Sequence, residues 1–416
     1  MTAPQSLLRP GMKHTLLKLV AAGAAGLLVC SVQAQETVRP DVGKPLQAAQ
    51  DLIKAGKYNE ALAKVREADA VSGKNAGESL LIERMRIAAA SGAGDVETAA
   101  RSFEVLSASG KVAAADKIRM AESIAGAYYR AKDYAKAMQW CQRYFKEGGT
   151  SASIRRLLIQ SQYLSGDFSG AAKELTAEVQ AAEKSGTPPA EDRLKLLLNA
   201  ALQQKDNNTY VYAVEKLVTY YPKKEYWVDL LSRMQRKPEF SDRLVLDAYR
   251  LSLAIGSMST ANDYMEMAQL SVQAGYPAEA KQVVDKGFAA GVLGAGAEAE
   301  RHKRLRDLVV KKLDEDKKTQ ADAQKQAISE KDGTGSVNAG LNLVFNGQAP
   351  QGLAMMQQGI SKGGLKRPED AKLHLGFAHL VAGDSAKAQA AFKTVAGTDG
   401  TADLARLWSL YAKRKP

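Results

Sequence analysis

Cysteine is scarce in this sequence. The 416 residues hold only Cys30 and Cys141. Two cysteines do not make a disulfide framework, and a catalytic thiol needs a histidine partner, which the sequence places beside neither of them. Cys141 follows Trp140 within an apolar helical pattern, so we expect its thiol to be buried.

Histidine is almost as rare, and its four copies do not form a metal-binding pattern. His374 and His379 lie five residues apart on one predicted helix, so they do not share a face as residues four apart would. His302 stands alone among basic residues, and His14 lies in the N-terminal segment described below. We interpret His379 as a packed core residue and predict no metal site and no cofactor.

Catalytic motifs are also missing. The sequence contains no HExxH, no Gly-x-Ser-x-Gly and no Walker-type glycine loop. The stretch GAGAEA from Gly294 matches part of a dinucleotide-binding fingerprint, but it follows a helical pattern rather than a strand. We therefore predict a loop at Gly294 and a protein that is not an enzyme.

A long apolar run occurs only near the N-terminus. Residues 12–34 combine basic residues, an apolar stretch and a small-residue cleavage site, as a secretory signal does. The stretch is too short to span a membrane. We expect cleavage after Ala34 and a periplasmic protein that begins at Gln35. Two alternatives remain: an uncleaved anchor, and a lipoprotein acylated at Cys30, although Val29 stands where such proteins usually have Gly, Ala or Ser.

The charge of the chain is strongly positive. The formal net charge is +12, and loss of the signal would remove Arg9, Lys13 and Lys18. A basic surface favours acidic partners, such as acidic protein faces, anionic lipid or anionic polysaccharide. We predict no nucleic acid partner, because the signal indicates export and the chain has no Lys/Arg block of the nucleic-acid type.

What the sequence does contain is a repeat. The stretches GKYNEAL, GDVETAA, AKDYAKAM and GDFSGAA align Tyr58, Val96, Tyr134 and Phe168 at intervals of 38, 38 and 34 residues, each followed by Ala three positions later. Such a period indicates stacked units that bury their apolar faces against their neighbours. The residue types suit helix hairpins, because Gly ends a first helix, Asp caps a second helix, and Ala allows close helix crossing.

These residues resemble the tetratricopeptide repeat (TPR) family. The clearest unit is AKLHLGFAHLVAGDSAKAQAAF, with Leu375-Gly376, Gly383, Ala388 and Phe392 at the positions of that family's pattern. The unit before it places Gly340, Gly347 and Gly352 at a uniform offset of 36 residues from Gly376, Gly383 and Ala388, a spacing that also resembles Sel-like repeats. The resemblance implies an all-α fold, a right-handed superhelical solenoid of antiparallel helix pairs.

The chain divides by pattern into five segments. They are a signal peptide (1–34), N-terminal TPR-like repeats (35–222), degenerate helical repeats (223–300), a charged helix or linker (301–334) and a C-terminal repeat pair (335–416).

Two groups of residues are candidates for partner binding. Tyr221, Tyr226 and Trp227 belong to an aromatic and basic cluster of the kind used by binding surfaces, or else they fill a junction where the repeat is irregular. By the TPR resemblance, the first helices of two units would line a concave face that holds a peptide. The residues implied for that face are Arg119, Glu122, Tyr129, Arg130, Arg156, Gln160 and Tyr163.

Arginine and tyrosine on such a face suit recognition of an acidic or extended segment of another protein. We therefore expect a non-enzymatic scaffold that mediates protein-protein interactions in the bacterial cell envelope. The alternative is a basic spacer that binds peptidoglycan or anionic lipid without using a specific groove.

Overall fold

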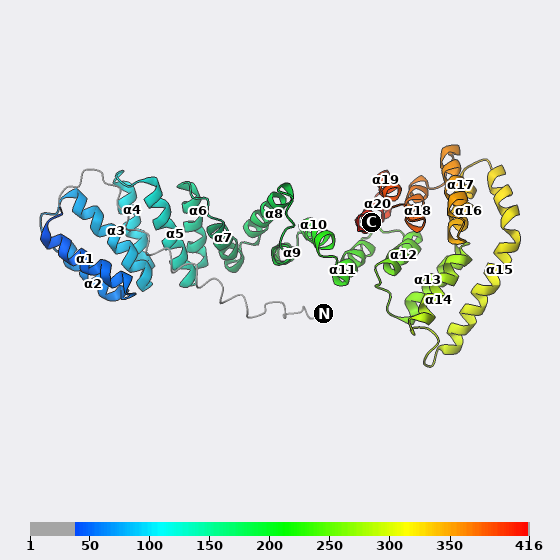
Figure 1. The fold of residues 1–416 in the computed structure, drawn as a ribbon, viewed down its shortest axis with the longest axis horizontal. Helices are drawn as coiled ribbons and strands as arrows, with labels where there is room; N and C mark the ends of the chain where they lie inside the picture. The colour runs from blue at the N-terminus through cyan, green and yellow to red at the C-terminus, as the bar shows by residue number, and fades with distance from the viewer. Residues whose placement is uncertain (1–37, 415–416) are drawn as a thin grey trace. The chain divides into compact units, whose positions relative to one another are not determined.

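The computed structural model describes residues 38–414, which form twenty α-helices and one short 3₁₀-helix and contain no strand. This confirms the predicted all-α fold. The predicted signal peptide and Cys30 lie outside the described residues. The chain divides between Tyr210 and Val211 into two compact units, and each unit is described by itself (Figure 1). The five predicted segments are a finer division and stay predictions.

The first unit is a row of helix hairpins, in which each first helix is followed by an antiparallel second helix (Figure 1). The first helices are α1 (Pro40–Lys54), α3 (Ala76–Ala93), α5 (Ala114–Arg130), α7 (Ala152–Ser165) and α9 (Glu191–Gln204). The second helices are α2 (Tyr58–Asp69), α4 (Val96–Ala108), α6 (Tyr134–Lys146), α8 (Phe168–Lys184) and α10 (Asn207–Tyr220), which ends in the second unit.

The predicted aspartate caps are confirmed at the start of α4, α6 and α8, whereas α2 has no side-chain cap. The carboxylates of Asp95, Asp133 and Asp167 accept hydrogen bonds from backbone N–H groups three residues later, at 3.2, 3.1 and 2.9 Å. Such caps satisfy donors that a helix leaves without partners in its first turn. The alanines predicted at the helix crossings are fully buried, namely Ala61, Ala99, Ala137 and Ala171.

The second unit contains α11 (Lys224–Gln235), η2 (Asp242–Leu244), α12 (Val245–Ala254), α13 (Ala261–Gln273), α14 (Pro277–Ala289) and α15 (Ala299–Ser329). It continues with α16 (Thr334–Phe345), α17 (Ala349–Lys362), α18 (Pro368–Val381), α19 (Ser385–Phe392) and α20 (Thr401–Ala412). Two hairpins, α16–α17 and α18–α19, lie in the segment predicted as the C-terminal repeat pair, with Gly347 and Gly383 in left-handed conformations at their turns. Their Sel-like character stays a prediction.

Helix α15 lies in the segment predicted as a charged helix or linker. One stripe of this 31-residue helix is buried, with His302, Leu305, Val309 and Leu313 spaced three and four residues apart. Leu305, Val309 and Leu313 belong to the same apolar cluster as residues of α13, α14, α16 and α17. The charged face is therefore the solvent side of a helix that takes part in the core of the second unit. Within residues 38–414, no helix is both long enough and apolar enough to cross a membrane.

Candidate functional site

The first helices of the first unit form a layer of their own. Helices α1, α3, α5 and α7 contact one another in turn, whereas contacts between α2, α4, α6 and α8 are fewer or absent. A two-layer array bends toward the layer whose helices lie closer together, so the first helices are on its inner side. We call the exposed side of α3, α5 and α7 the first-helix face.

Arginine side chains dominate the polar contacts on this face. Asp116 at the start of α5 pairs with Arg119, and it also accepts from Arg84 of α3 at 3.1 Å. Two guanidinium groups thus share one carboxylate, which leaves a net positive charge. Arg156 of α7 is exposed and forms no ion pair with any residue of 38–414. This distribution suits an anionic ligand.

Glu122 lies three residues after Arg119 on α5 and behaves differently. Its side chain is half-buried, and this burial raises the pKa of the carboxyl group above its ordinary value. Glu122 makes the first-helix face mixed in charge, so a complementary segment would place acidic groups opposite the arginines and not opposite Glu122.

Tyr129 and Gln160 of the face connect neighbouring hairpins, and Tyr129 and Tyr163 also pack within their own hairpins. The Tyr129 hydroxyl of α5 donates to Gln160 Oε1 of α7 over 3.3 Å, and the Tyr129 ring packs edge-on against Tyr134. Tyr163 packs edge-on against Phe168, with ring centroids 5.2 Å apart. All of these side chains are half-buried, so each presents only part of its surface to a ligand.

Arg130 has a structural role that the sequence did not reveal. Its guanidinium donates to the carbonyl of Ser91, in the last turn of α3, over 3.2 Å. A cation there satisfies a carbonyl at the negative end of the helix dipole. Burial of the guanidinium group lowers the pKa of Arg130. Arg130 thus links two hairpins, and its removal would disturb the array itself.

The predicted aromatic and basic cluster is not one surface. Trp227 is 1% exposed, and its ring lies 6.4 Å from that of Tyr411 and under the guanidinium of Arg414. Trp227 therefore fills a junction in the core, as the alternative interpretation held, and it is not available as a surface contact. Tyr221 and Tyr226 are half-buried, and their role in binding stays a prediction.

A buried charge cluster at the centre of the second unit was missed by the sequence analysis. Arg250 of α12 is 3% exposed and pairs with Asp247 at 2.7 Å and with both carboxylate oxygens of Glu279 at 2.7 and 2.8 Å. His374 of α18 lies 3.1 Å from Asp247. The Arg250 guanidinium also lies 5.3 to 5.4 Å from the ring centroids of three aromatic residues, Tyr276, Phe345 and Phe377.

The pKa values in this cluster follow from its pairing. Burial alone would raise the pKa of Asp247, but the charges of His374 and Arg250 outweigh it and hold that pKa well below its ordinary range. Burial opposes the charge of Arg250, yet Glu279 and Asp247 raise its pKa. Asp247 and Arg250 therefore stay ionised as a buried pair, and the cluster faces side chains of the same unit.

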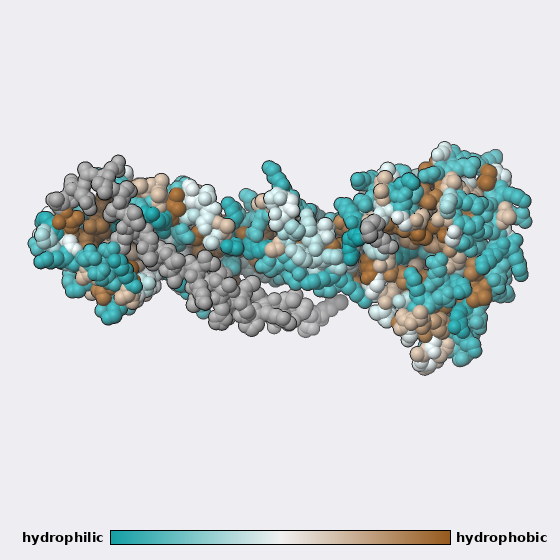
Figure 2. All heavy atoms as spheres, in the orientation of Figure 1, coloured by the Kyte–Doolittle hydropathy of each residue, from teal (hydrophilic) through white to brown (hydrophobic). Residues whose placement is uncertain are grey.

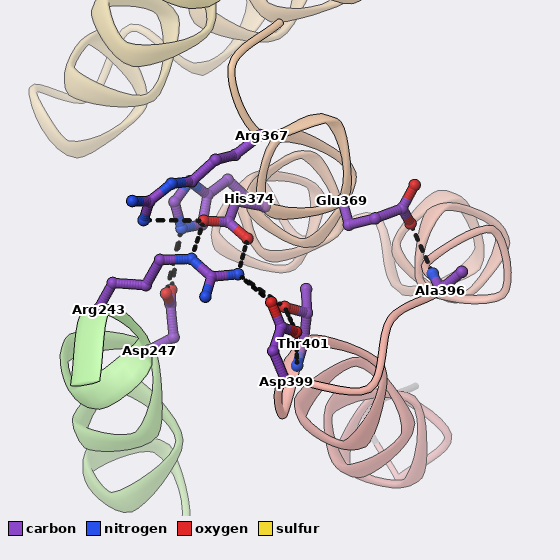
Figure 3. Close-up of polar contacts among 9 residues, drawn as sticks. Arg243, Asp247, Arg367, Glu369, His374, Ala396, Asp399 and Thr401 are labelled. Carbon is purple, nitrogen blue, oxygen red and sulfur yellow. Dashed lines mark hydrogen bonds and ion pairs between the residues drawn. The ribbon is translucent and has the colours of Figure 1, made fainter. Parts of the chain in front are cut away.

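A second ion network joins the same parts of the chain near the surface (Figure 3). Arg243 donates to both carboxylate oxygens of Asp370, each at 2.9 Å, and to Asp399 at 2.6 Å. Asp399 in turn accepts from the Thr401 hydroxyl at 2.6 Å. Figure 3 shows Arg243 and Asp247 on one side and His374, Asp399 and Thr401 on the other. The end of the chain thus returns to α12, and the second unit closes on itself.

No local signal in the sequence pointed to these two clusters. Arg243 and Asp370, like Asp247 and His374, are separated by 127 residues. A repeat pattern defines each hairpin but not which distant hairpins meet. An apolar helix that carries Asp247 and Arg250 three residues apart is the only unusual feature, since charged residues are rarely buried unless they are paired.

The cysteine, the histidine and the loop singled out in the sequence have structural roles. Cys141 is fully buried, which raises the pKa of its thiol to about 12, and His379 is buried with a lowered pKa, also because of burial. Residues 291–298 form the predicted loop, in which the Gly294 N–H donates to His302 Nδ1 at 3.1 Å. Within residues 38–414, no group of three or more His, Cys, Asp or Glu side chains is placed to hold a metal ion.

Comparison with known proteins gives similarity to solved structures alone. No protein-family model and no curated protein matches the chain. The TPR2AB domain of yeast Sti1, solved in a complex described as pHSP90, is 15% identical with a TM-score of 0.32, covering 65% of this chain and 98% of that chain.

Two further structures are similar over more of the chain. Yeast Tom70 is 12% identical with a TM-score of 0.25, and the match covers 89% of this chain and 95% of that chain. The P58(IPK) TPR domain is 11% identical with a TM-score of 0.22, and the match covers 90% of this chain and 98% of that chain. At these scores the similarities add no argument about function. The TPR-like fold rests on the hairpins, caps and buried alanines described above.

Proposed function

We propose that the chain is an exported scaffold of the bacterial envelope, which binds another protein and catalyses no reaction. The observation that supports this most directly is the first-helix face, where Arg84, Arg119 and Arg156 come from three successive first helices. Asp116 neutralises only part of this charge. A rigid array of hairpins with partly unpaired arginines on its inner side suits an acidic or extended segment of a protein partner.

The second unit has a different part in this proposal. Its ion clusters are satisfied within the unit, and Arg243 and Arg250 have carboxylate partners of their own. Recognition of an acidic segment is therefore assigned to the first unit.

The test uses residues 35–416 as bait for solubilised envelope extract of the source cell, washed at low and then at moderate salt. We expect a discrete protein to stay bound at moderate salt and to be lost when Arg119 and Arg156 are both changed to Ala. Arg101→Ala is the matched control, because Arg101 is exposed on α4 and bonds only to Thr98 of the same helix. Arg130 is unsuitable as a target, since it caps α3.

If the bait retains only cell-wall or lipid material that washes off as salt rises, and Arg119→Ala with Arg156→Ala changes nothing, partner binding through the first-helix face is wrong. The chain would then act as a basic spacer that binds peptidoglycan or anionic lipid through screened, nonspecific charge.

Export is tested separately. The proposal expects the protein in the periplasmic fraction with Gln35 as its first residue by N-terminal sequencing. A blocked N-terminus with lipid attached at Cys30 would support the lipoprotein alternative instead. A chain that keeps residues 12–34 and stays in the cytoplasm would contradict export.

A further inference from the structure

A cavity of about 320 Å³ lies in the second unit, where three helix ends meet. Pro222 and Lys224 contribute from the start of α11, Ala254 and Ile255 from the end of α12, and Tyr411 and Arg414 from the end of α20, with Trp227 as an inner wall. It belongs to neither ion cluster, and the first-helix face lies in the other unit.

The lining combines positive charge with aromatic and aliphatic surface. Lys224 and Arg414 are both exposed, and neither forms an ion pair within residues 38–414. No acidic residue lines this cavity. Lys224 also borders a neighbouring hollow that Glu225 and Asp229 line. The cavity therefore carries two cationic side chains, and Ala254, Ile255 and the Trp227 ring form the apolar part of its wall.

The geometry orients one of these cations. The Arg414 guanidinium lies 5.9 Å from the centroid of the Trp227 ring, as a cation-π contact requires. A guanidinium held over a ring keeps its planar N–H fork free for a carboxylate. Lys224 stands at the first position of α11, where the helix has no side-chain cap and its N-terminus adds positive partial charge.

We propose that this cavity binds a carboxylate carried on an apolar or aromatic body. The carboxylate would pair with Arg414 and Lys224, and the apolar body would contact the Tyr411 and Ile255 side chains, next to the buried Trp227 ring. The volume is at the lower end of the range of small-molecule sites, so it suits a single residue at the carboxyl end of a peptide or a small organic acid.

The test measures how residues 35–416 bind two carboxylic acids and the uncharged amides of the same acids. The probes are 3-phenylpropionate and N-acetyl-Gly-Phe with a free carboxyl end, each compared with its amide. Binding is followed through the three tryptophan indole N–H signals in NMR spectra, with the Trp227 signal assigned from a Trp227→Phe variant. We expect the Trp227 signal to shift saturably with the acids and the Trp140 signal of α6 to stay unchanged.

Matched variants make the test specific. Lys224→Gln and Arg414→Gln should each weaken binding by roughly tenfold or more, since each removes a charge-assisted contact, while both variants stay folded because both side chains are exposed. Lys413→Gln removes an exposed neighbouring charge that does not line the cavity and should leave affinity within about twofold. If N-acetyl-Gly-Phe binds more tightly than 3-phenylpropionate, the natural ligand is the carboxyl end of a protein. If the two bind equally, the natural ligand is a free organic acid.

The proposal is overturned if the amides bind as well as the acids, if Lys224→Gln and Arg414→Gln bind like the unchanged chain, or if the Trp227 signal does not move at millimolar probe. Variants of Arg119 and Arg156 should have no effect on this binding, which separates it from the proposed function of the first-helix face.

Discussion

At the scale of single residues, the turn inside each hairpin of the first unit depends on one left-handed backbone position. Gly56, Gly94 and Gly166 occupy it in three hairpins, with φ between 73° and 87°. Lys132 and Lys205 occupy the same place in two others, with φ of 61° and 58°. A side chain in this conformation costs about 1–2 kcal/mol because its Cβ approaches the following carbonyl oxygen.

Lys132→Gly should therefore stabilise the protein by about 0.5–1 kcal/mol, after the greater flexibility of glycine in the unfolded chain is subtracted. Urea denaturation should show a higher midpoint. The control is Lys173→Gly, in the middle of α8, which should lose about 1 kcal/mol because glycine is a poor helix former. A lower midpoint for Lys132→Gly would show that its side chain contributes more than its backbone strain costs.

At the scale of helices, the closest packing occurs between α16 and α17. A Cβ atom on Gly340 would lie 2.6 Å from the carbonyl oxygen of Gly352, and a Cβ on Gly352 would lie 2.4 Å from that of Gly340. The obstacle in both cases is backbone, which cannot rotate away as a side chain can. Two of the three glycines that the repeat spacing singled out in this unit, Gly340 and Gly352, thus mark a direct backbone contact between two helices.

Gly340→Ala should cost about 1–3 kcal/mol by forcing these helices apart. Gly43→Ala, in α1, is the matched control, because its nearest atom would be at 3.6 Å and alanine favours a helix, so it should stabilise by about 0.5–1 kcal/mol. Thermal unfolding checks both. An unchanged melting temperature for Gly340→Ala would mean that the helices separate at little cost.

The features that the sequence predicted well are local ones. The Asp133 cap joins residues three apart, and the burial of Ala137 follows from its place on a single helix. The candidate face was predicted only by register, which placed Arg119 and Arg156 on the surface but did not reveal that Arg130 caps the preceding hairpin. Pairings such as Arg243 with Asp370 depend on where distant hairpins meet, and no periodic pattern encodes that.

At the scale of the second unit, closure relies on charges. Arg250 is surrounded by the carboxylates that pair with it and by three aromatic rings. Arg243, just before α12, pairs with Asp399 in the segment before α20. In Figure 2, hydrophilic residues cover much of the visible surface of this unit, with hydrophobic residues in smaller groups. Ion pairs that hold distant hairpins together should make closure sensitive to acid.

Asp399 gives the pH range of this effect. The Thr401 hydroxyl bond lowers the pKa of Asp399 to about 2, with burial opposing and Arg243 contributing. A carboxylate with a pKa below its unfolded value, roughly 3.9, contributes its full stability above that value and loses it as the pH falls through the folded pKa. The stability of the second unit should therefore fall between about pH 4 and pH 2.

Arg243→Gln tests this link between charge and closure. The variant should be less stable than the unchanged chain at pH 6 and should lose less stability on acidification, because part of the lowering of the Asp399 pKa disappears with the guanidinium. Urea midpoints measured from pH 6 to pH 2 give the comparison. Arg301→Gln is the control, since Arg301 is exposed and pairs only with Glu298 in the adjoining turn. Parallel pH curves for Arg243→Gln and the unchanged chain would show that closure rests on apolar packing around α12 and α20 rather than on this ion network.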